Sequence, residues 1–219
     1  MRVVLLHAFP LDERMWEPQL DNLSGHELLT PRLYGRGRTM DEWAASLLDE
    51  IHGGLVLVGA SMGGYCALAM KRRAPERVAG LVLAGSRADA DTPERRAGRA
   101  DTIELIRREG APSLWESMRP KLLAEDADGA LVGRARALAL GRQVEDLVAA
   151  VEAIRDRADN SDLLAGRTLA ILGDADPFVS AEDVPAEEVY VLPGASHLVS
   201  MERATEFNEL LEGWLEQWQ

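Results

Sequence analysis

A short apolar run that ends at a serine between two glycines constrains the fold of this chain more than any other feature. The run over residues 55–58 is typical of a buried strand, and the pattern from Tyr65 to Arg72 is typical of a helix. Ser61 is therefore expected on a sharp strand-to-helix turn. Such a turn strains the serine backbone, and the residues two positions before and after it must be small, or strand and helix collide. Gly59 and Gly63 meet this requirement.

The position of Ser61 predicts a nucleophile. The first amide groups of the following helix carry partial positive charge and point toward whatever the serine attacks, so they supply half of an oxyanion hole. The glycine-x-serine-x-glycine pattern also arises by chance in a chain with 19 glycines. The inference therefore depends on whether later strands end in an acid and a histidine.

Other short apolar runs predict a parallel α/β sheet. They lie at residues 3–6, 78–84, 168–173 and 189–193, with a weaker run at 27–31. Strands that alternate with helices at short intervals indicate a sheet of about six parallel strands covered on both faces. Thr39, with Glu42 three residues later, predicts a capping box at the start of one of these helices. Modest helices are expected at 14–23 and after Leu198.

The pattern changes between residues 92 and 164, where helical periodicity is present and no run is convincing as a strand. Thr92-Pro93 is a helix start, Gly110 is a breaker, and further helices are expected at 112–123, 130–140 and 144–154. We expect an all-helical cap, approximately residues 88–165, inserted into a single domain that spans 1–219. A separate helical domain would leave the sheet without its final strands.

Two later strands end in the groups that a serine nucleophile needs. Gly-Asp-Ala-Asp at 173–176 follows one strand, and Gly-Ala-Ser-His at 194–197 follows the next. An imidazole takes the proton of the serine, and a carboxylate orients the imidazole. Because ligands bind at the carboxyl ends of the strands in open α/β sheets, the three groups are expected to converge on one crevice.

The remaining histidines and the cysteine have simpler interpretations. His7 closes the first strand and is expected to hydrogen-bond locally and hold the following loop, whereas His26 and His52 are expected on the surface. Cys66 is the only cysteine, which excludes an intramolecular disulfide, and its apolar helical context predicts a small buried side chain.

Charge and motif content limit the partners. A net charge of −13 argues against nucleic acid and against an anionic membrane surface, since both need a concentrated basic face. The first apolar run is too short for an export signal or a membrane span, so a cytoplasmic location is expected. No HExxH, paired CxxC or strand-linked GxGxxG is present, so no metal or cofactor is expected. The expected partner is a small-molecule substrate, and the choice between monomer and homo-oligomer stays open.

Taken together, these motifs resemble the α/β-hydrolase family. The matching segments lie at residues 5–12, 59–63, 173–176 and 194–197. The resemblance implies that Ser61 is the nucleophile, that His197 is the general base and then the general acid, and that Asp176 orients the imidazole. It also implies an oxyanion hole formed by the backbone amides of Phe9 and Met62.

Alternatives for the acid remain within this resemblance. Asp176 is preferred to Asp174 because the family's usual spacing is glycine, two residues, aspartate. Some members carry the acid after the preceding strand, where Asp89 or Asp91 would be the candidates. The chain also departs from the family pattern, with Ala8 where glycine is common and without the customary leading strands, which predicts a reduced sheet.

The leading hypothesis for function is a serine hydrolase that cleaves small carboxylic esters, thioesters or lactones through an acyl-enzyme on Ser61. A second hypothesis is a carbon–carbon bond hydrolase or lyase that acts on a small carboxylic acid with the same triad. A third, from a different class, is a receptor-like module that binds a ligand with negligible turnover.

Substrate contacts are expected from the cap. Trp115, Met118 and Arg119 are the candidates, although helical spacing favours a core role for most apolar residues of this segment. Several arginines around the cap could bind a carboxylate, but solvated helix faces are the expected role for them. These arginines are Arg87, Arg95, Arg96, Arg99 and Arg119.

Overall fold

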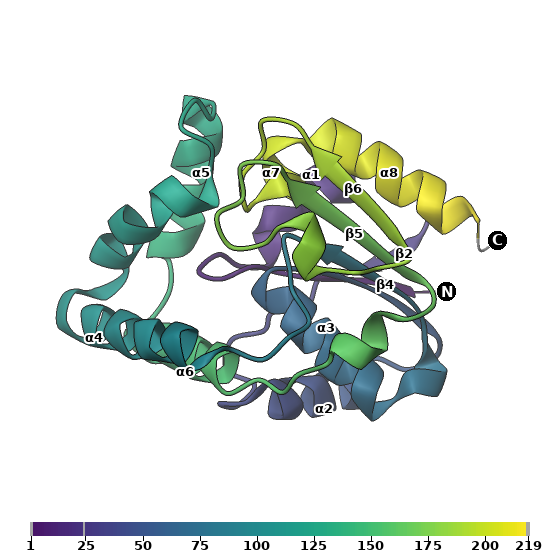
Figure 1. The fold of residues 1–219 in the computed structure, drawn as a ribbon, viewed down its shortest axis with the longest axis horizontal. Coiled ribbons are helices and arrows are strands. Elements are labelled where there is room, and N and C mark those ends of the chain that lie inside the picture. Colours follow the sequence, from purple (N-terminus) through teal and green to yellow (C-terminus); the bar gives the residue numbers. More distant parts are fainter. Residues whose placement is uncertain (1, 24, 218–219) are drawn as a thin grey trace.

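The computed structural model describes residues 2–23 and 25–217, which are built around one parallel sheet (Figure 1). The strand order in this six-stranded sheet is β2-β1-β3-β4-β5-β6, and each neighbouring pair is parallel. The strands are β1 (Arg2–Leu6), β2 (Glu27–Leu29), β3 (Leu55–Ala60), β4 (Val78–Ala84), β5 (Thr168–Gly173) and β6 (Glu188–Leu192). The predicted parallel sheet is confirmed, and the weak run at 27–31 forms a short edge strand.

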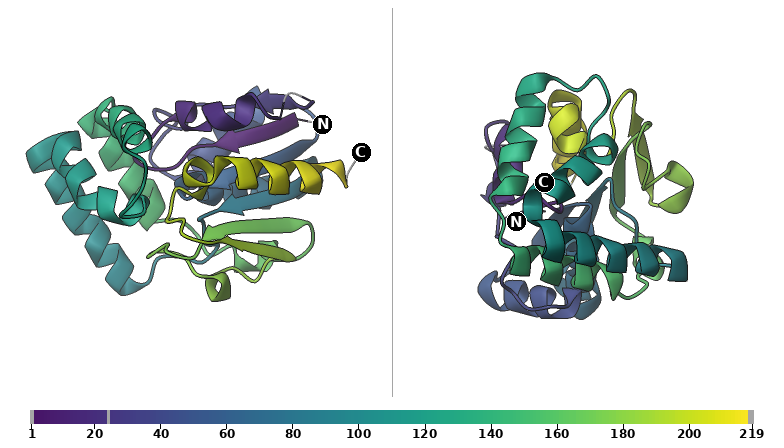
Figure 2. Two further views of the ribbon diagram at one scale, coloured as in Figure 1. Left: turned by 90° about the horizontal axis from the view of Figure 1, so that it is seen from above. Right: turned by 90° about the vertical axis from the view of Figure 1, so that its left-hand side faces the viewer.

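Helices cover both faces of the sheet. On one face lie α2 (Met40–Glu50) and α3 (Met62–Arg73), and on the other lie α1 (Glu17–Leu20) and α8 (Ala204–Glu216) (Figures 1 and 2). Successive residues of a strand point to opposite faces, so Val4 joins the core beneath α2 and α3 while Val3 joins the core beneath α8. Each fully buried side chain of this size contributes about 1.5–3 kcal/mol, which explains why the central strands are apolar throughout.

The α2 and α3 helices begin as the sequence predicts. The Thr39 hydroxyl accepts a hydrogen bond from the Glu42 amide at 3.1 Å, and the Glu42 carboxylate accepts one from the Thr39 amide at 3.0 Å, so the capping box is confirmed. In α3, Cys66 is fully buried, and burial raises the pKa of its thiol to about 12. The side chain is therefore an inert part of the core.

The cap is the group of three helices that the chain forms between β4 and β5. They are α4 (Pro93–Leu122), α5 (Gly129–Leu140) and α6 (Val144–Arg155), and the short helix η3 (Ser161–Leu164) follows them. Gly110, with φ 72° and ψ −167°, breaks α4 into two arms. Figure 2 shows the cap at one end of the sheet. The domain limits 88–165 and 1–219 stay predictions.

Two predicted helices differ in the structure. The segment 14–23 forms a 3-10 turn, η1 (Glu13–Trp16), and then only α1, which ends at Leu20. The continuous helix expected after Leu198 is interrupted, because Arg203 has non-helical φ and ψ of −123° and 51° and separates α7 (Val199–Glu202) from α8. The Arg203 side chain donates from Nε to the Pro193 carbonyl at 3.1 Å, which holds this break against the loop after β6.

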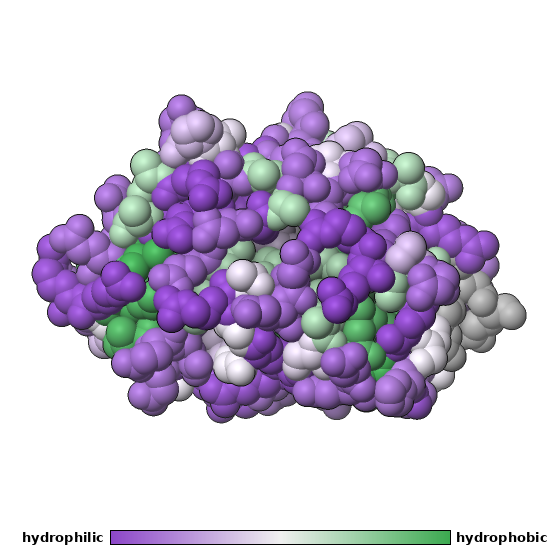
Figure 3. All heavy atoms as spheres, turned by 90° about the horizontal axis from the view of Figure 1, so that it is seen from below, coloured by the Kyte–Doolittle hydropathy of each residue, from purple (hydrophilic) through white to green (hydrophobic). Residues whose placement is uncertain are grey.

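The surface is mainly hydrophilic on the face shown in Figure 3, with hydrophobic residues gathered in small areas. This agrees with the high content of charged residues, 28% of the chain. Across residues 2–23 and 25–217, no helix combines the length and the apolar composition that crossing a membrane requires.

Candidate active site

Ser61 lies at the turn between β3 and α3, and its backbone is strained. Among the described residues, Ser61 is the only non-glycine residue with a positive φ, and its φ and ψ are 48° and −112°. Such a conformation costs about 1–3 kcal/mol and persists where the surroundings enforce it. A Cβ atom on Gly59 would lie 2.4 Å from Gly64 Cα, and one on Gly63 would lie 2.0 Å from the Leu6 carbonyl oxygen. The predicted requirement for small residues at 59 and 63 is therefore confirmed.

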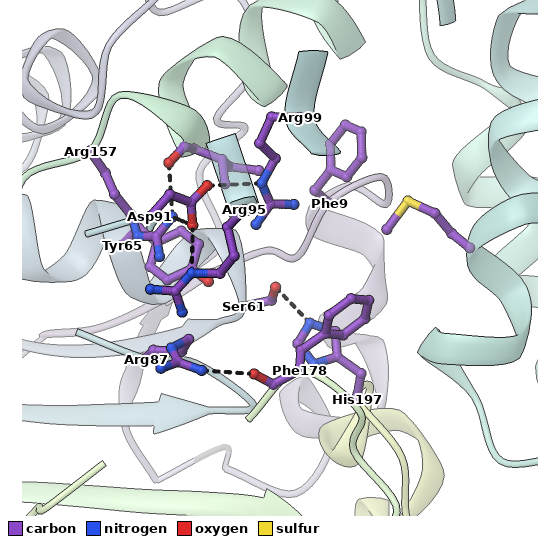
Figure 4. A pocket seen from close by; sticks show the side chains of 12 residues that line it. Phe9, Ser61, Tyr65, Arg87, Asp91, Arg95, Arg99, Arg157, Phe178 and His197 are labelled. Atoms are coloured by element: carbon purple, nitrogen blue, oxygen red, sulfur yellow. Dashed lines mark hydrogen bonds and ion pairs between the residues drawn. The ribbon is translucent and has the colours of Figure 1, made fainter. Parts of the chain in front are cut away.

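The loops after three strands bring a serine, a histidine and an aspartate into one hydrogen-bonded chain, of which Figure 4 shows the serine and the histidine. His197 Nε2 lies 2.7 Å from Ser61 Oγ, and His197 Nδ1 lies 2.8 Å from Asp176 Oδ2. The side chains of Asp176 and His197 are 0% and 5% exposed. Because Nδ1–H donates a hydrogen bond to the carboxylate, Nε2 carries the lone pair that can accept the serine proton.

The other candidate acids have different partners. Asp174 is exposed and accepts a hydrogen bond from the Gly194 amide at 2.7 Å, which fixes the loop after β6. Asp89 accepts from Arg87 Nε at 2.7 Å, and Asp91 accepts from Arg157 Nη1 at 2.6 Å. Of the acids considered from the sequence, Asp176 is the one whose carboxylate contacts the imidazole of His197.

Two neighbours hold the acid and the imidazole in place. The second oxygen of Asp176 accepts a hydrogen bond from the Phe178 amide at 2.8 Å, and the Phe178 ring lies edge-on to the His197 ring with centroids 4.8 Å apart. Glu202 accepts hydrogen bonds from the Ser196 amide at 2.8 Å and the Ala124 amide at 2.7 Å. Burial raises the pKa of the Glu202 carboxyl above its usual value. Glu202 thus joins the loop of the histidine to the residues just after α4.

The amides expected to form an oxyanion hole lie on the loop after β1 and at the start of α3. No turn or loop hydrogen bond among the described residues uses the backbone N–H of Phe9 or Met62. His7 supports the first of these loops: its Nε2 accepts from the Leu33 amide at 3.1 Å, and its Nδ1 donates to the Ala8 carbonyl at 3.2 Å. Burial lowers the pKa of His7 to about 4, so the ring is neutral at physiological pH.

The two other histidines differ from each other. His52 is exposed, as the sequence predicts. His26 is largely covered, with 11% of its side chain exposed, and its Nε2 lies 3.3 Å from a carboxylate oxygen of Glu212 on α8. His26 is therefore less exposed than expected for a surface position, because Glu212 of α8 lies against its ring.

The hydroxyl of Ser61 opens into an inner cavity of about 60 Å³ between the sheet and the cap. An outer cavity of about 240 Å³ shares Phe9, Arg95, Arg99, Met118 and Phe178 with it and adds aliphatic walls from the cap. Of the three substrate contacts expected from the cap, Met118 lines both cavities. Trp115 is 2% exposed in the core beneath the cap, and Arg119 lies outside both cavities with its Nη2 3.4 Å from the Glu125 carbonyl.

Three of the arginines expected on solvated helix faces line the inner cavity instead. They are Arg87, Arg95 and Arg99. Arg95 and Arg99 are four residues apart on α4 and so lie on one face of the helix, whereas Arg96 faces away and pairs with Asp156 at 2.6 Å. The spacing of four residues between Asp91, Arg95 and Arg99 was a signal in the sequence that these side chains lie on one side. Beyond these three arginines, other residues that line the inner cavity were not expected there from the sequence. These residues are Tyr65, Asp91, Ile154, Arg157 and Phe178.

Comparisons with known proteins agree with this architecture. Residues 3–210 match the model of the alpha/beta hydrolase family. A thermophilic esterase from Thermogutta terrifontis, solved with malate bound, is 32% identical with a TM-score of 0.90, and the match covers 99% of this chain and 90% of that one. An enol-lactonase from Burkholderia xenovorans has the same fold, with 23% identity and a TM-score of 0.84 over 98% of this chain and 91% of that one.

Among curated proteins, a pimeloyl-acyl-carrier-protein methyl ester esterase from Aromatoleum aromaticum is 38% identical over 91 residues. This match covers 38% of the present chain and 36% of the esterase. The chain spans between 36% and 63% of the length of the curated relatives it matches.

Proposed function

We propose that this chain, which belongs to the alpha/beta hydrolase family, is a carboxylesterase-type serine hydrolase that cleaves small esters, thioesters or lactones through an acyl-enzyme on Ser61. One observation carries the proposal. A continuous set of hydrogen bonds runs from Asp176 through His197 to the Ser61 hydroxyl, at 2.8 and 2.7 Å, and that hydroxyl faces a cavity.

The first half of the proposed reaction forms the acyl-enzyme. His197 Nε2 takes the proton of Ser61 as Oγ attacks the carbonyl carbon, and the carbonyl π electrons move onto oxygen. The backbone amides of Phe9 and Met62 donate hydrogen bonds to this oxyanion, which develops its charge in the transition state. His197 then protonates the leaving alcohol, thiol or lactone oxygen as the bond to the acyl carbon breaks.

The second half releases the acid. His197 removes a proton from water as the water oxygen attacks the acyl carbon, and it returns that proton to Ser61 Oγ as the ester bond to the enzyme breaks. Asp176 stays ionised throughout, holds the imidazole in the tautomer with hydrogen on Nδ1, and stabilises the imidazolium that forms in each half.

The comparisons support the class of reaction. The Thermogutta terrifontis protein, similar over nearly the whole chain, is an esterase, and the curated relative from Aromatoleum aromaticum acts on a methyl ester. The small volume next to Ser61, about 60 Å³, favours a short group at the reacting end of the substrate.

The proposal is tested by replacing the nucleophile. Ser61→Ala should lower kcat/KM for short p-nitrophenyl esters by about 10⁴-fold or more while the circular dichroism spectrum is unchanged. A fluorophosphonate probe should add to the peptide that carries Ser61 in the wild-type protein and not in the variant. Ser46→Ala, on α2, serves as the matched serine control.

Retained turnover in Ser61→Ala would remove Ser61 as the nucleophile. Cleavage of a small β-diketo acid at a rate far above that of any ester would assign the carbon–carbon reaction to the same triad. Tight binding of a ligand without any product would favour the receptor-like alternative.

A further inference from the structure

Four arginines surround the inner cavity that contains Ser61, and they differ in how many of their N–H groups are used. They are Arg87, Arg95, Arg99 and Arg157. They face three carboxylates, those of Asp89, Asp91 and Asp183. In the ion pairs given for the described residues, four guanidinium groups thus share three carboxylates, in a chain whose net charge is −13.

Arg87 is fully engaged by the protein. Its Nε and Nη2 bind the two oxygens of Asp89 at 2.7 and 3.1 Å, Nη2 also binds Asp183 at 2.9 Å, and Nη1 donates to the Phe178 carbonyl at 3.2 Å. Burial acts to raise the pKa of Asp89, but the hydrogen bonds from Arg87 and Arg95 outweigh it and leave this pKa below its usual value. Asp89 thus stays ionised and remains an ion-pair partner of Arg87 and Arg95.

Arg157 is the most deeply buried arginine of the cluster. Its side chain is 2% exposed, its guanidinium carbon lies 4.1 Å from the centre of the Tyr65 ring, and its Nη1 donates to Asp91 at 2.6 Å. Its buried Nη2 has no hydrogen-bond partner among the described residues. A buried N–H group without a partner is destabilising, and a hydrogen-bond acceptor that reaches it removes this penalty.

Arg95 and Arg99 lie on one face of α4 and line both cavities. Arg95 Nη2 binds Asp89 and the Ala90 carbonyl, its buried Nε faces Asp91 Oδ1 at 3.6 Å without a hydrogen bond, and its Nη1 takes part in no hydrogen bond given for the described residues. Arg99 uses Nε, which donates to Asp91 at 3.0 Å, and neither of its terminal amino groups takes part in a hydrogen bond given for the described residues. Figure 4 shows both guanidinium groups on the cap side of Ser61.

We propose that Arg99 and Arg95 form a carboxylate-binding subsite, so that the ester cleaved at Ser61 bears a second, negatively charged carboxylate. This inference rests on the proposed function and names its substrate class. The free amino groups of Arg99 present the planar fork that matches the two oxygens of a carboxylate, and Arg95 supplies a further donor. Asp91 holds both guanidinium groups from behind, so little side-chain freedom is lost on binding.

The size of the inner cavity limits how far the carboxylate can be from the ester. A cavity of about 60 Å³ accommodates only a few heavy atoms, so two to four bonds should separate the charged group from the scissile carbonyl. The remaining part of the substrate occupies the outer cavity, where Leu105, Leu114 and Val151 supply apolar contacts. The class is therefore the short half-ester, in which one acid group is esterified and the other is free.

The test compares charged esters with neutral esters of nearly the same shape. The pairs are monomethyl glutarate against methyl pentanoate, with the charge on the acyl side, and 3-acetoxypropanoate against propyl acetate, with the charge on the alcohol side. We expect kcat/KM for the charged member of at least one pair to exceed that of its neutral partner by about tenfold to a hundredfold. The preference should appear in KM more than in kcat and should shrink as salt is added.

Variants connect this preference to the two arginines. Arg99→Met should reduce the charged-to-neutral ratio by about tenfold to a hundredfold, and Arg99→Lys should reduce it less, because the charge remains while the fork is lost. Arg96→Met is the matched control, since Arg96 is adjacent to Arg95 on α4 but pairs with Asp156 away from the cavity. This control should leave the ratio unchanged.

Competition by free glutarate against a neutral ester provides a measurement that needs only the wild-type protein, should a variant fold poorly. Inhibition by glutarate but not by glutaramide, the uncharged diamide of the same length, supports the subsite. A ratio near one in both ester pairs, together with no inhibition by glutarate, would overturn it even if Ser61 is the nucleophile. Loss of the proposed function is seen separately, as turnover that survives Ser61→Ala.

Discussion

The sheet side and the cap side of the inner cavity are built in opposite ways. On the sheet side, Ser61, Asp176 and His197 each lie in the connection that follows a strand, and they form hydrogen bonds with one another at 2.7 and 2.8 Å. On the cap side, Arg95 and Arg157 come from α4 and from the segment after α6, and each retains a buried N–H group without a hydrogen-bond partner among the described residues. The sheet side, whose three side chains are hydrogen-bonded to one another, is suited to carrying out the reaction. The cap side, which retains unused donors, is suited to selecting the substrate.

The largest expected effect concerns the sheet side alone. His197→Ala should lower kcat/KM by about 10⁴-fold for charged and neutral esters alike, because the imidazole takes part in every proton transfer. The measurement is kcat/KM for the charged ester and for the neutral ester, together with the ratio of these two values. A variant that loses the charged ester selectively would show that His197 also belongs to substrate choice and would break the division between the two sides.

The backbone of the sheet side should tolerate less change than its surroundings. Gly59→Ala places a Cβ atom 2.4 Å from Gly64 Cα, so we expect a loss of about 3 kcal/mol or more in the free energy of unfolding, measured in urea. Gly54→Ala, at a position with no atom within 4 Å of the added Cβ, is the control. Equal stability of the two variants would mean that the turn can relax.

The loop after β1 should make the fold sensitive to acid. His7 has a pKa of about 4 in the folded protein against 6.5 for an ordinary histidine, so between these values the unfolded chain binds a proton that the folded protein does not. The free energy of unfolding should therefore fall as pH drops from 6.5 to 4, by about 3 kcal/mol from His7. Urea titrations at several pH values measure this slope. His7→Gln should flatten it and His52→Gln should leave it unchanged, and identical slopes would exclude His7 as the source.

The smallest expected effect lies at the boundary between the two sides. Phe178 touches the His197 ring and also borders both cavities. Phe178→Leu should position the imidazole less well and raise the activation free energy by about 1 kcal/mol. This should be seen as a less than tenfold fall in kcat that is equal for both members of an ester pair. A change in the charged-to-neutral ratio would instead place Phe178 with the substrate-selecting side.

The sheet and the convergence of Ser61, Asp176 and His197 could be predicted because each depends on local sequence pattern. Apolar runs give the strands, and the groups that follow Gly59, Gly173 and Gly194 reach one edge through the topology of a parallel sheet. The same reasoning identified Asp176 over Asp174 through the spacing of the family it resembles. None of these inferences needed the side-chain packing of distant segments.

The cap side could not be predicted to the same depth. Arg157 reaches the cavity only because α6 brings the chain back across α3, where Tyr65 receives its guanidinium group. Arg95 and Arg96 are adjacent in sequence and alike in chemistry, and only the rotation of α4 about its axis separates the one that faces the cavity from the one that faces water. The rotation of α4 also decides the place of Trp115, which was expected to contact substrate and is instead buried in the core.

The two hydrogen bonds that Glu202 accepts, from Ser196 and from Ala124, restrict where new specificities can arise in this scaffold. Residues near the end of α4 are fastened to the loop of the histidine, since Leu198 also donates its amide to the Leu122 carbonyl at 3.0 Å. Replacing that end would disturb His197, the proposed general base. Positions 95 and 99, in the first arm of α4 before Gly110, have no such tie to the histidine loop among the described contacts. Laboratory evolution toward other substrates should therefore accumulate changes in the first arm of α4 and leave residues 122–124 alone.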